Sequence, residues 1–322
     1  MALSNMKVFN EYLKRTTIET LAQDVEKFNA SSAGAIRLTT QGIDGDFLQE
    51  SFWAGLHGAQ RRVDRYAANG AQASTPLAQK QYDSVKIAGG FGPILWEPSQ
   101  LSWIQKNPEE ALEVISRNLS EAIMADQLNT AISALAGAIG NQPSATNDVS
   151  ATAGVTYVAI NNAHALFGDA SQRLVAQVMT GAMYHKLVGQ NLANAERLFQ
   201  FSGVQVVDIL GKAVIITDAP ALYEAGTPNK QKVLSLADGA AVVMDGSDLI
   251  TNIQTSNGKE RIETTMQADY TFGLGLKSYT WDTANGGKSP TNAELSTGTN
   301  WDLVANSIKA SAGVLTIGDA TK

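Results

Sequence analysis

The longest regular pattern of hydrophobic positions runs over residues 107–139 and predicts one long helix. Its apolar residues form two stripes at helical spacing: Leu112, Ile115, Leu119 and Ile123, then Met124, Leu128, Ile132, Leu135 and Ile139. Asn107 is a suitable N-cap, and Pro108 suits the first helical position. Glu109 and Glu110 then favour the positive end of the helix dipole.

Gly137, Gly140 and Pro143 are expected to stop this helix. At 1.5 Å per residue its length is roughly 45–50 Å, which is long for a globular domain. The apolar stripes do not keep a sustained heptad spacing, so a coiled coil is not expected.

A second helical pattern lies near the N-terminus. The segment Thr16-Thr17-Ile18-Glu19 has the form of a capping box. Apolar residues then recur at helical spacing: Ile18, Leu21, Val25 and Phe28. The pattern predicts a short amphipathic helix that ends near residues 31–34. It could pack on its own domain or serve as an arm that docks on a neighbouring chain.

Residues 51–106 read as an extended and mostly polar region. Residues 81–87 alternate with period two, residues 91–96 form a second extended segment, and Ala88-Gly89-Gly90 lies between them. Two extended segments joined by glycines predict a long hairpin. Both of its faces are too polar for a core hairpin, and a lone hairpin is marginal in water. We therefore expect it to lie on another surface.

The polar stretch over residues 141–153 is the best candidate for a domain boundary. Beyond it, helical and extended patterns alternate, which indicates an α+β or α/β layer. Helices are expected over 155–167 and 180–187, and strands over 173–179, 204–209, 213–217, 233–236 and 240–244. Residues 250–281 look antiparallel with Asn257-Gly258 as a hairpin signal, residues 283–299 look like a loop, and residues 309–317 look like a last strand.

Composition excludes several classes of function. The net charge of −7 and the lack of any basic run make tight nucleic-acid binding a poor fit. The absence of cysteine excludes disulfides, thiolate nucleophiles and cysteine-ligated zinc. The N-terminus has no apolar core of a signal peptide, and no stretch is long and apolar enough to predict a transmembrane helix.

A search for catalytic, cofactor or metal sites yields none. His57, His164 and His185 lie in different segments and lack metal-ligand spacing. Gly286-Gly287-Lys288-Ser289 resembles the end of a phosphate-binding loop, but Asp282 stands where that motif needs a glycine. Capping of the long helix explains the pair Glu109 and Glu110.

Asp218 is the one carboxylate that needs weighing, because it follows the expected strand 213–217. An aspartate at the end of a buried strand can be catalytic or metal-binding in an α/β enzyme. Here it precedes Ala219 and Pro220, which favours a turn. We predict a structural role for it, and hence a protein whose long helix, polar hairpin and arm make contacts.

The order of these segments resembles that of the major capsid proteins of tailed bacteriophages, which have the Hong Kong 97-type fold. The long helix matches that family's spine helix. Four further stretches resemble its later modules: AQVMTGAMYHKL (176–187) with GKAVIITDAPAL (211–222), VLSLADGAAVVMD (233–245), RIETTMQADYTFGLGLKSYTWD (261–282) and NWDLVANSIKASAGVLTI (300–317). Each motif alone is loose, and their order and spacing carry the resemblance over nearly the whole chain.

The resemblance implies an α+β capsid fold and a role for each part. Residues 1–50 would be the N-arm, and residues 51–106 would carry an extended E-loop that lies over the neighbouring subunit. Residues 107–150 and 261–322 would form the P domain with the spine helix, and residues 151–260 the axial A domain. Asp218 would then be a turn residue of the A domain.

The resemblance also implies partners. The subunit would assemble with itself into pentamers and hexamers of an icosahedral virion, built in the bacterial cytoplasm, and would enclose double-stranded DNA without reading it. A scaffolding protein, a portal and a decoration protein would be further partners, with no membrane and no cofactor. Because no long segment precedes the arm here, scaffolding would be a separate protein or the chain an already processed form.

Other outcomes stay open at this point. Some capsid proteins cross-link a lysine to an asparagine, and Lys80 and Lys86 lie in the appropriate loop, but no partner asparagine or activating glutamate can be chosen. An encapsulin-like compartment would share the fold but enclose protein cargo. An unrelated α+β enzyme with a carboxylate site is the third alternative.

Overall fold

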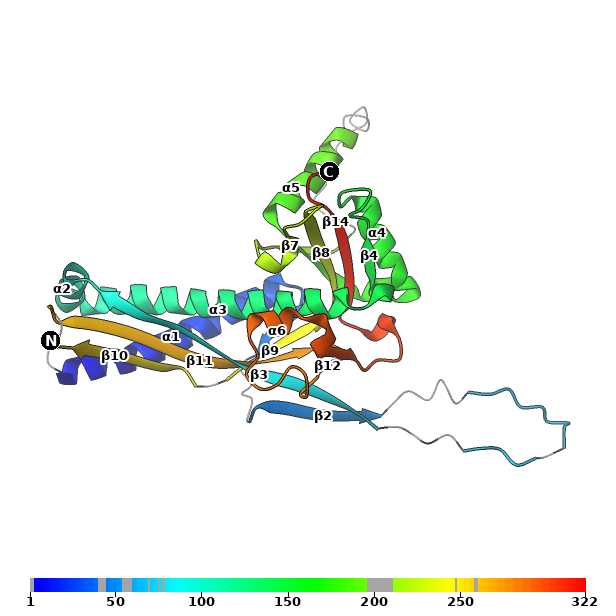
Figure 1. The fold of residues 1–322 in the computed structure, drawn as a ribbon, viewed down its shortest axis with the longest axis horizontal. Coiled ribbons are helices and arrows are strands. Elements are labelled where there is room, and N and C mark those ends of the chain that lie inside the picture. The colour runs from blue at the N-terminus through cyan, green and yellow to red at the C-terminus, as the bar shows by residue number, and fades with distance from the viewer. Residues whose placement is uncertain are drawn as a thin grey trace.

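The computed structural model describes residues 3–39, 45–53, 60–68, 70–74, 76, 79–195, 211–246, 248–257 and 260–322. These residues form an eight-stranded sheet and a six-stranded sheet. The first sheet runs along the long helix α3, and the second stands above the C-terminal end of that helix (Figure 1). The result is an elongated body with a second layer at one end.

Helix α3 spans Pro108–Gly140 and confirms the predicted long helix. Asn107 holds the N-cap position, but its side chain makes no capping hydrogen bond. The expectation that Gly137 helps to stop the helix is wrong, because Gly137 lies within α3. A Cβ at this position would come within 2.2 Å of the Ser296 carbonyl oxygen, so the glycine permits close approach of the neighbouring chain.

Helix α1 spans Leu3–Ser31, and the predicted start near Thr16 is wrong. The hydroxyls of Thr17 and Thr20 donate to the carbonyls of Leu13 and Thr16 one turn earlier, at 2.8 and 2.9 Å. Threonines bonded in this way belong to a helix interior. The helix contacts α3 and strand β10 of its own chain, and Leu13 is fully buried.

Strand β11, Glu263–Leu276, is the centre of the first sheet. It pairs with β3 (Gln79–Trp96), β9 (Ala241–Asp245), β10 (Ile250–Ser256) and β12 (Tyr279–Trp281). The remaining strands are β1 (Ile36–Thr39), β2 (Phe47–Trp53) and β13 (Trp301–Leu303), which pair with β9, β3 and β12 respectively. The antiparallel arrangement expected for residues 250–281 is confirmed.

Strand β3 corrects the predicted hairpin over residues 81–96, because it is one continuous strand. Gly89 and Gly90 face Tyr270 and Asp269 of β11 in the ladder and do not form a turn. A Cβ on Gly89 would lie 2.7 Å from the Tyr270 ring. Gly89 therefore lets the Tyr270 ring pack directly against the backbone of β3, a known role of glycine within a strand.

The second sheet has the order β4-β14-β8-β5-β6, with β7 beside β8. Its strands are β4 (Thr146–Asp148), β5 (Leu174–Met179), β6 (Ala213–Ile216), β7 (Tyr223–Glu224), β8 (Lys230–Ala237) and β14 (Gly313–Asp319). Helices α4 (Tyr157–Leu166) and α5 (Gly181–Ala195) lie on this layer. The strand expected over 204–209 lies outside the described residues, as does Gly258 of the hairpin signal.

Two short helices lie in segments where none was predicted. Helix α2, Pro98–Lys106, begins where the side chain of Gln100 accepts a hydrogen bond from the Glu97 backbone at 3.0 Å. Helix α6, Asn292–Ser296, lies in the segment expected to be a loop, and Thr291 and Glu294 form its capping box.

Sheet membership differs from the predicted domain ranges in three places. Strands β9 and β10 fall within residues 151–260 but belong to the first sheet. Strand β14 was assigned to the same unit as the long helix but lies in the second sheet beside β8. The polar stretch 141–153 contains β4, which pairs with β14. Long-range strand pairing, which local patterns do not encode, decides these memberships.

The substitution Gly89→Ala should lower the free energy of unfolding by about 1–3 kcal/mol, because the added methyl group overpacks against a buried aromatic ring. Gly70→Ala is the matched control, since a Cβ there meets nothing within 4 Å. Urea denaturation of both variants measures the difference. Equal stability of the two variants would contradict the packing role of Gly89.

Candidate assembly surfaces

The feature that projects furthest from the body is an arm built on the paired strands β2 and β3. Described residues 60–68 and 70–74 lie beyond the end of this pair, away from both sheets (Figure 1). All of them are exposed, with Tyr66 at 100% and Val63 at 62%. Tyrosine is among the residues enriched at protein interfaces, so the arm is a candidate contact surface.

Polar contacts hold the base of the arm to the body. The Tyr82 hydroxyl donates to the Leu276 carbonyl at 2.8 Å, and the Asp83 amide donates to the Thr280 hydroxyl at 2.9 Å. Burial raises the pKa of Tyr82 to about 12, which keeps its hydroxyl a donor. The arm therefore leaves the body in one direction from an anchored base.

The two lysines considered for cross-linking also lie on this strand. The amine of Lys80 donates to the Val304 carbonyl at 2.5 Å and to Asn306 Oδ1 at 2.9 Å, within its own chain. Lys86 lies 3.7 Å from the Asp248 carboxylate. In this arrangement both lysines help to fasten β3 to its surroundings.

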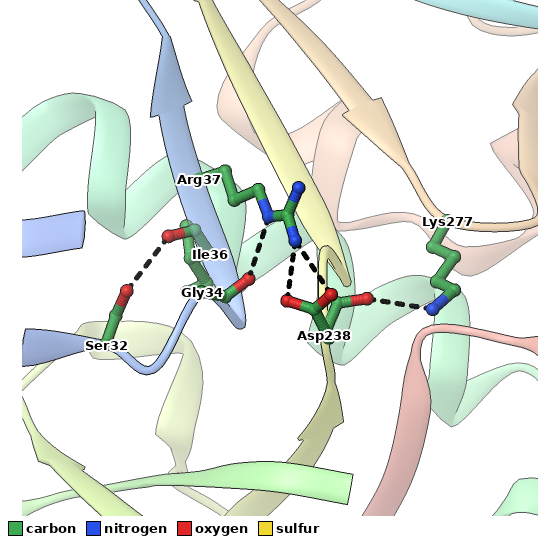
Figure 2. A network of polar contacts seen from close by, with 6 residues as sticks. All are labelled: Ser32, Gly34, Ile36, Arg37, Asp238 and Lys277. Carbon is green, nitrogen blue, oxygen red and sulfur yellow. Dashed lines mark hydrogen bonds and ion pairs between the residues drawn. The ribbon is translucent and has the colours of Figure 1, made fainter. Parts of the chain in front are cut away.

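A polar junction forms where the chain crosses from β8 of the second sheet to β9 of the first. Arg37 of β1 donates to both carboxylate oxygens of Asp238, at 2.8 and 2.7 Å, and Lys277 donates to the Asp238 carbonyl at 2.8 Å (Figure 2). The Gly239 amide also donates to the Gly34 carbonyl. The N-terminal segment thus holds the crossover between the two layers.

A groove of about 440 Å³ lies at the opposite end of the body from the arm, between β3, α2 and α3. Its lining is mostly apolar and includes Phe91, Ile94, Trp96, Trp103, Ile115 and Met266. Ile94 is half-exposed, and the adjacent Leu95 is 38% exposed. Such a surface is suited to contact with another chain.

The two histidines within the described residues, His164 and His185, do not come together. His164 of α4 is buried and lies 2.9 Å from the Ser235 hydroxyl, whereas His185 of α5 is exposed beside Tyr184. His57 lies outside the described residues. Burial, with a smaller effect from the charge of Lys212, lowers the pKa of His164 to about 4. This imidazole is therefore neutral at pH 7.

Asp218 accepts a hydrogen bond from the Gly181 amide at 3.1 Å, at the start of α5. It is a surface residue that satisfies a free amide of a helix N-terminus. Gly286–Ser289 lies in the loop after β12, where the Trp281 indole donates to the Gly287 carbonyl and Lys288 pairs with Asp46. Neither segment shows a cluster of reactive groups in these contacts.

Across the described residues no three or more His, Asp or Glu side chains gather where they could hold a metal ion. In the same residues no helix combines the length and the apolar character that a membrane span requires.

Comparison with known protein families assigns the chain to one of them. Residues 5–315 match the model of the Gp13-like family, described as major capsid protein 13-like. The chain belongs to this family of major capsid proteins.

Solved structures of phage capsids are similar to this chain. The capsid protein of cyanophage Pam1 matches with a TM-score of 0.52 at 12% identity, over 88% of each chain. That of the Helicobacter pylori bacteriophage KHP30 matches with a TM-score of 0.48 at 10% identity, over 90% of this chain and 89% of the other. No curated protein sequence matches this chain.

The family and the Pam1 likeness confirm the predicted Hong Kong 97-type fold and the role of a major coat subunit in a virion capsid. They give no support to the encapsulin and enzyme alternatives. Some contacting features were not found from the sequence. The Arg37–Asp238 pair joins distant segments and leaves no local signal, whereas the tryptophans near residue 100 could have indicated the groove.

The buried His164 should make the subunit sensitive to acid. Its folded pKa of about 4 lies below the unfolded value near 6.5, so the unfolded state binds the extra proton first. The contribution of His164 to the free energy of unfolding is fully present above pH 6.5. It is lost as the pH falls towards 4, and the loss is at most about 3 kcal/mol. Urea denaturation between pH 7.5 and 4 measures this slope.

The variant His164→Gln removes the titrating group and should flatten that part of the slope. His185→Gln is the control and should keep the profile of the parent protein. An identical pH slope in the parent protein and His164→Gln would show that burial of this imidazole does not carry the effect.

Proposed function

We propose that this major coat subunit assembles into pentamers and hexamers that close an icosahedral head around double-stranded DNA. The observation that carries the proposal is the projecting arm on a two-layer body, because a shell subunit needs contact surfaces beyond its own core. Many modest interfaces related by symmetry then add up to a stable shell. The net charge of −7 limits adhesion to the enclosed DNA.

Each part of the subunit has a proposed role. Helix α3 with the first sheet would be the P domain, and the second sheet with α4 and α5 the A domain, whose loops meet around the five-fold and six-fold axes. Residues 51–78 would be the E-loop, and the segment through residue 50 the N-arm. The role is structural, with no catalytic step.

Scaffolding, portal and decoration proteins are the proposed further partners, with assembly in the cytoplasm of the bacterial host. These partners are inferred from the family resemblance, and their contacts on this chain are open to experiment.

Expression of the chain, alone and with a co-expressed scaffold, tests the proposal. Light scattering after size exclusion and negative-stain electron microscopy should reveal closed shells, tubes or ring-shaped capsomers. A monodisperse species near the subunit mass of 34.1 kDa under both conditions would overturn the proposal.

A further inference from the structure

We infer that the cavity between α1, α3 and the first sheet binds a small neutral molecule of the size of phenol, with an apolar body and one hydroxyl group. The cavity has a volume of about 150 Å³ and is more enclosed than the groove beside α2. Its walls belong to a single subunit, so the site does not depend on the proposed assembly.

The walls of this cavity are mostly apolar. Helices α1 and α3 and strands β1 and β9 supply the larger side chains, which are Ile18, Leu21, Val25, Ile123, Leu38 and Val243. Protein interiors leave few voids larger than a water molecule. An apolar cavity of roughly this size stays dry and can bind benzene. The volume and the lining therefore suit one aromatic ring.

A buried amide in the wall lacks a hydrogen-bond partner. Gln127 of α3 lines the cavity and is only 5% exposed. Its side-chain amide forms no hydrogen bond within the described part of the chain. Such a group is unfavourable, and nearly all buried polar groups in folded proteins are paired. A ligand hydroxyl beside Gln127 would satisfy it.

Other polar side chains of the wall are already engaged. The hydroxyls of Thr39, Tyr270 and Thr271 each donate to a carbonyl or carboxylate oxygen of the protein, and Asp245 also has an interaction partner. A buried water molecule typically makes about three hydrogen bonds, which the Gln127 amide alone does not supply. The cavity therefore favours a molecule with an apolar body over water.

The cavity reaches the surface beside α1. Ile18 is 46% exposed, and the wall residue Ala22 one turn later is also exposed. A small molecule can therefore enter without unfolding of the chain. Because α1 forms one wall, a bound molecule would hold this helix against α3.

Isothermal titration calorimetry of the purified full chain with phenol and with benzene tests the site. The variant Gln127→Leu removes the amide and keeps a side chain of similar size. It should lower the affinity for phenol by about tenfold, the effect of one hydrogen bond, and leave the affinity for benzene within about twofold. Equal phenol affinity in both proteins, or no binding of either compound to the folded parent protein, overturns the inference.

The double variant Val25→Ile with Val243→Ile locates the binding, because it fills part of the cavity. It should weaken the binding of both compounds by at least about fivefold. Val114→Ile with Val158→Ile is the matched control, since both valines are exposed and neither lines the cavity. Circular dichroism checks that each variant folds. Binding that the filling variant leaves unchanged would place the ligand elsewhere and contradict the proposed site.

Hydrogen exchange of the parent protein gives a readout that needs no variant. Saturating phenol should slow amide exchange over residues 16–25 of α1 by at least about threefold and leave α4 unchanged. Protection confined to other parts of the chain would sink the assignment of the ligand to this cavity. Each of these failures leaves the proposed coat function intact, because shell formation is measured separately.

Discussion

The contact between β11 and α3 is the interaction on which the body of the subunit depends. Tyr270 of β11 donates a hydrogen bond to the Asp126 carboxylate of α3 at 2.6 Å. The same ring stacks with Phe91 and Phe272 at centroid distances of 5.5 and 6.3 Å. Burial and the adjacent carboxylate raise the pKa of Tyr270, so its hydroxyl remains a donor. Because β11 also pairs with β3, β9, β10 and β12, this one strand joins the helix to the first sheet.

The arm inherits its direction from the same strand. Residues 85–96 of β3 pair with β11, whereas residues 79–85 pair with β2 and are bonded to the body through Lys80, Tyr82 and Asp83. One continuous strand thus belongs to the core at one end and to a projecting surface at the other. The arm therefore begins from a strand that the core holds in place.

How much the sequence could predict depended on the range of the interactions involved. Helix α3 was predictable because its apolar residues recur at helical spacing over many turns and its first turn carries residues that favour a helix start. The role of Gly89 was not predictable, because it depends on Tyr270, which is distant in sequence. Two glycines between extended segments are also typical of a turn. The sheet to which β14 belongs was unpredictable for a related reason, since a buried strand does not specify its partner. For the candidate surfaces, the polar arm was evident as a contact device, whereas the groove exists only when α2 and β3 meet.

The proposed assembly places different demands on the two ends of the body. The end near α2 presents apolar side chains that are only partly covered, which is unfavourable for an isolated subunit in water. The other end presents an arm whose exposed tyrosine and valine bear the same penalty. The groove residues Trp96, Ile104 and Met266 belong to the main hydrophobic core cluster, so the groove is an edge of that core that the rest of the chain leaves open. Apolar side chains that lie at the open edge of a core and on a projecting arm are the kind of surface that subunits cover when they assemble, so the exposed surface of the single subunit agrees with a role in a shell.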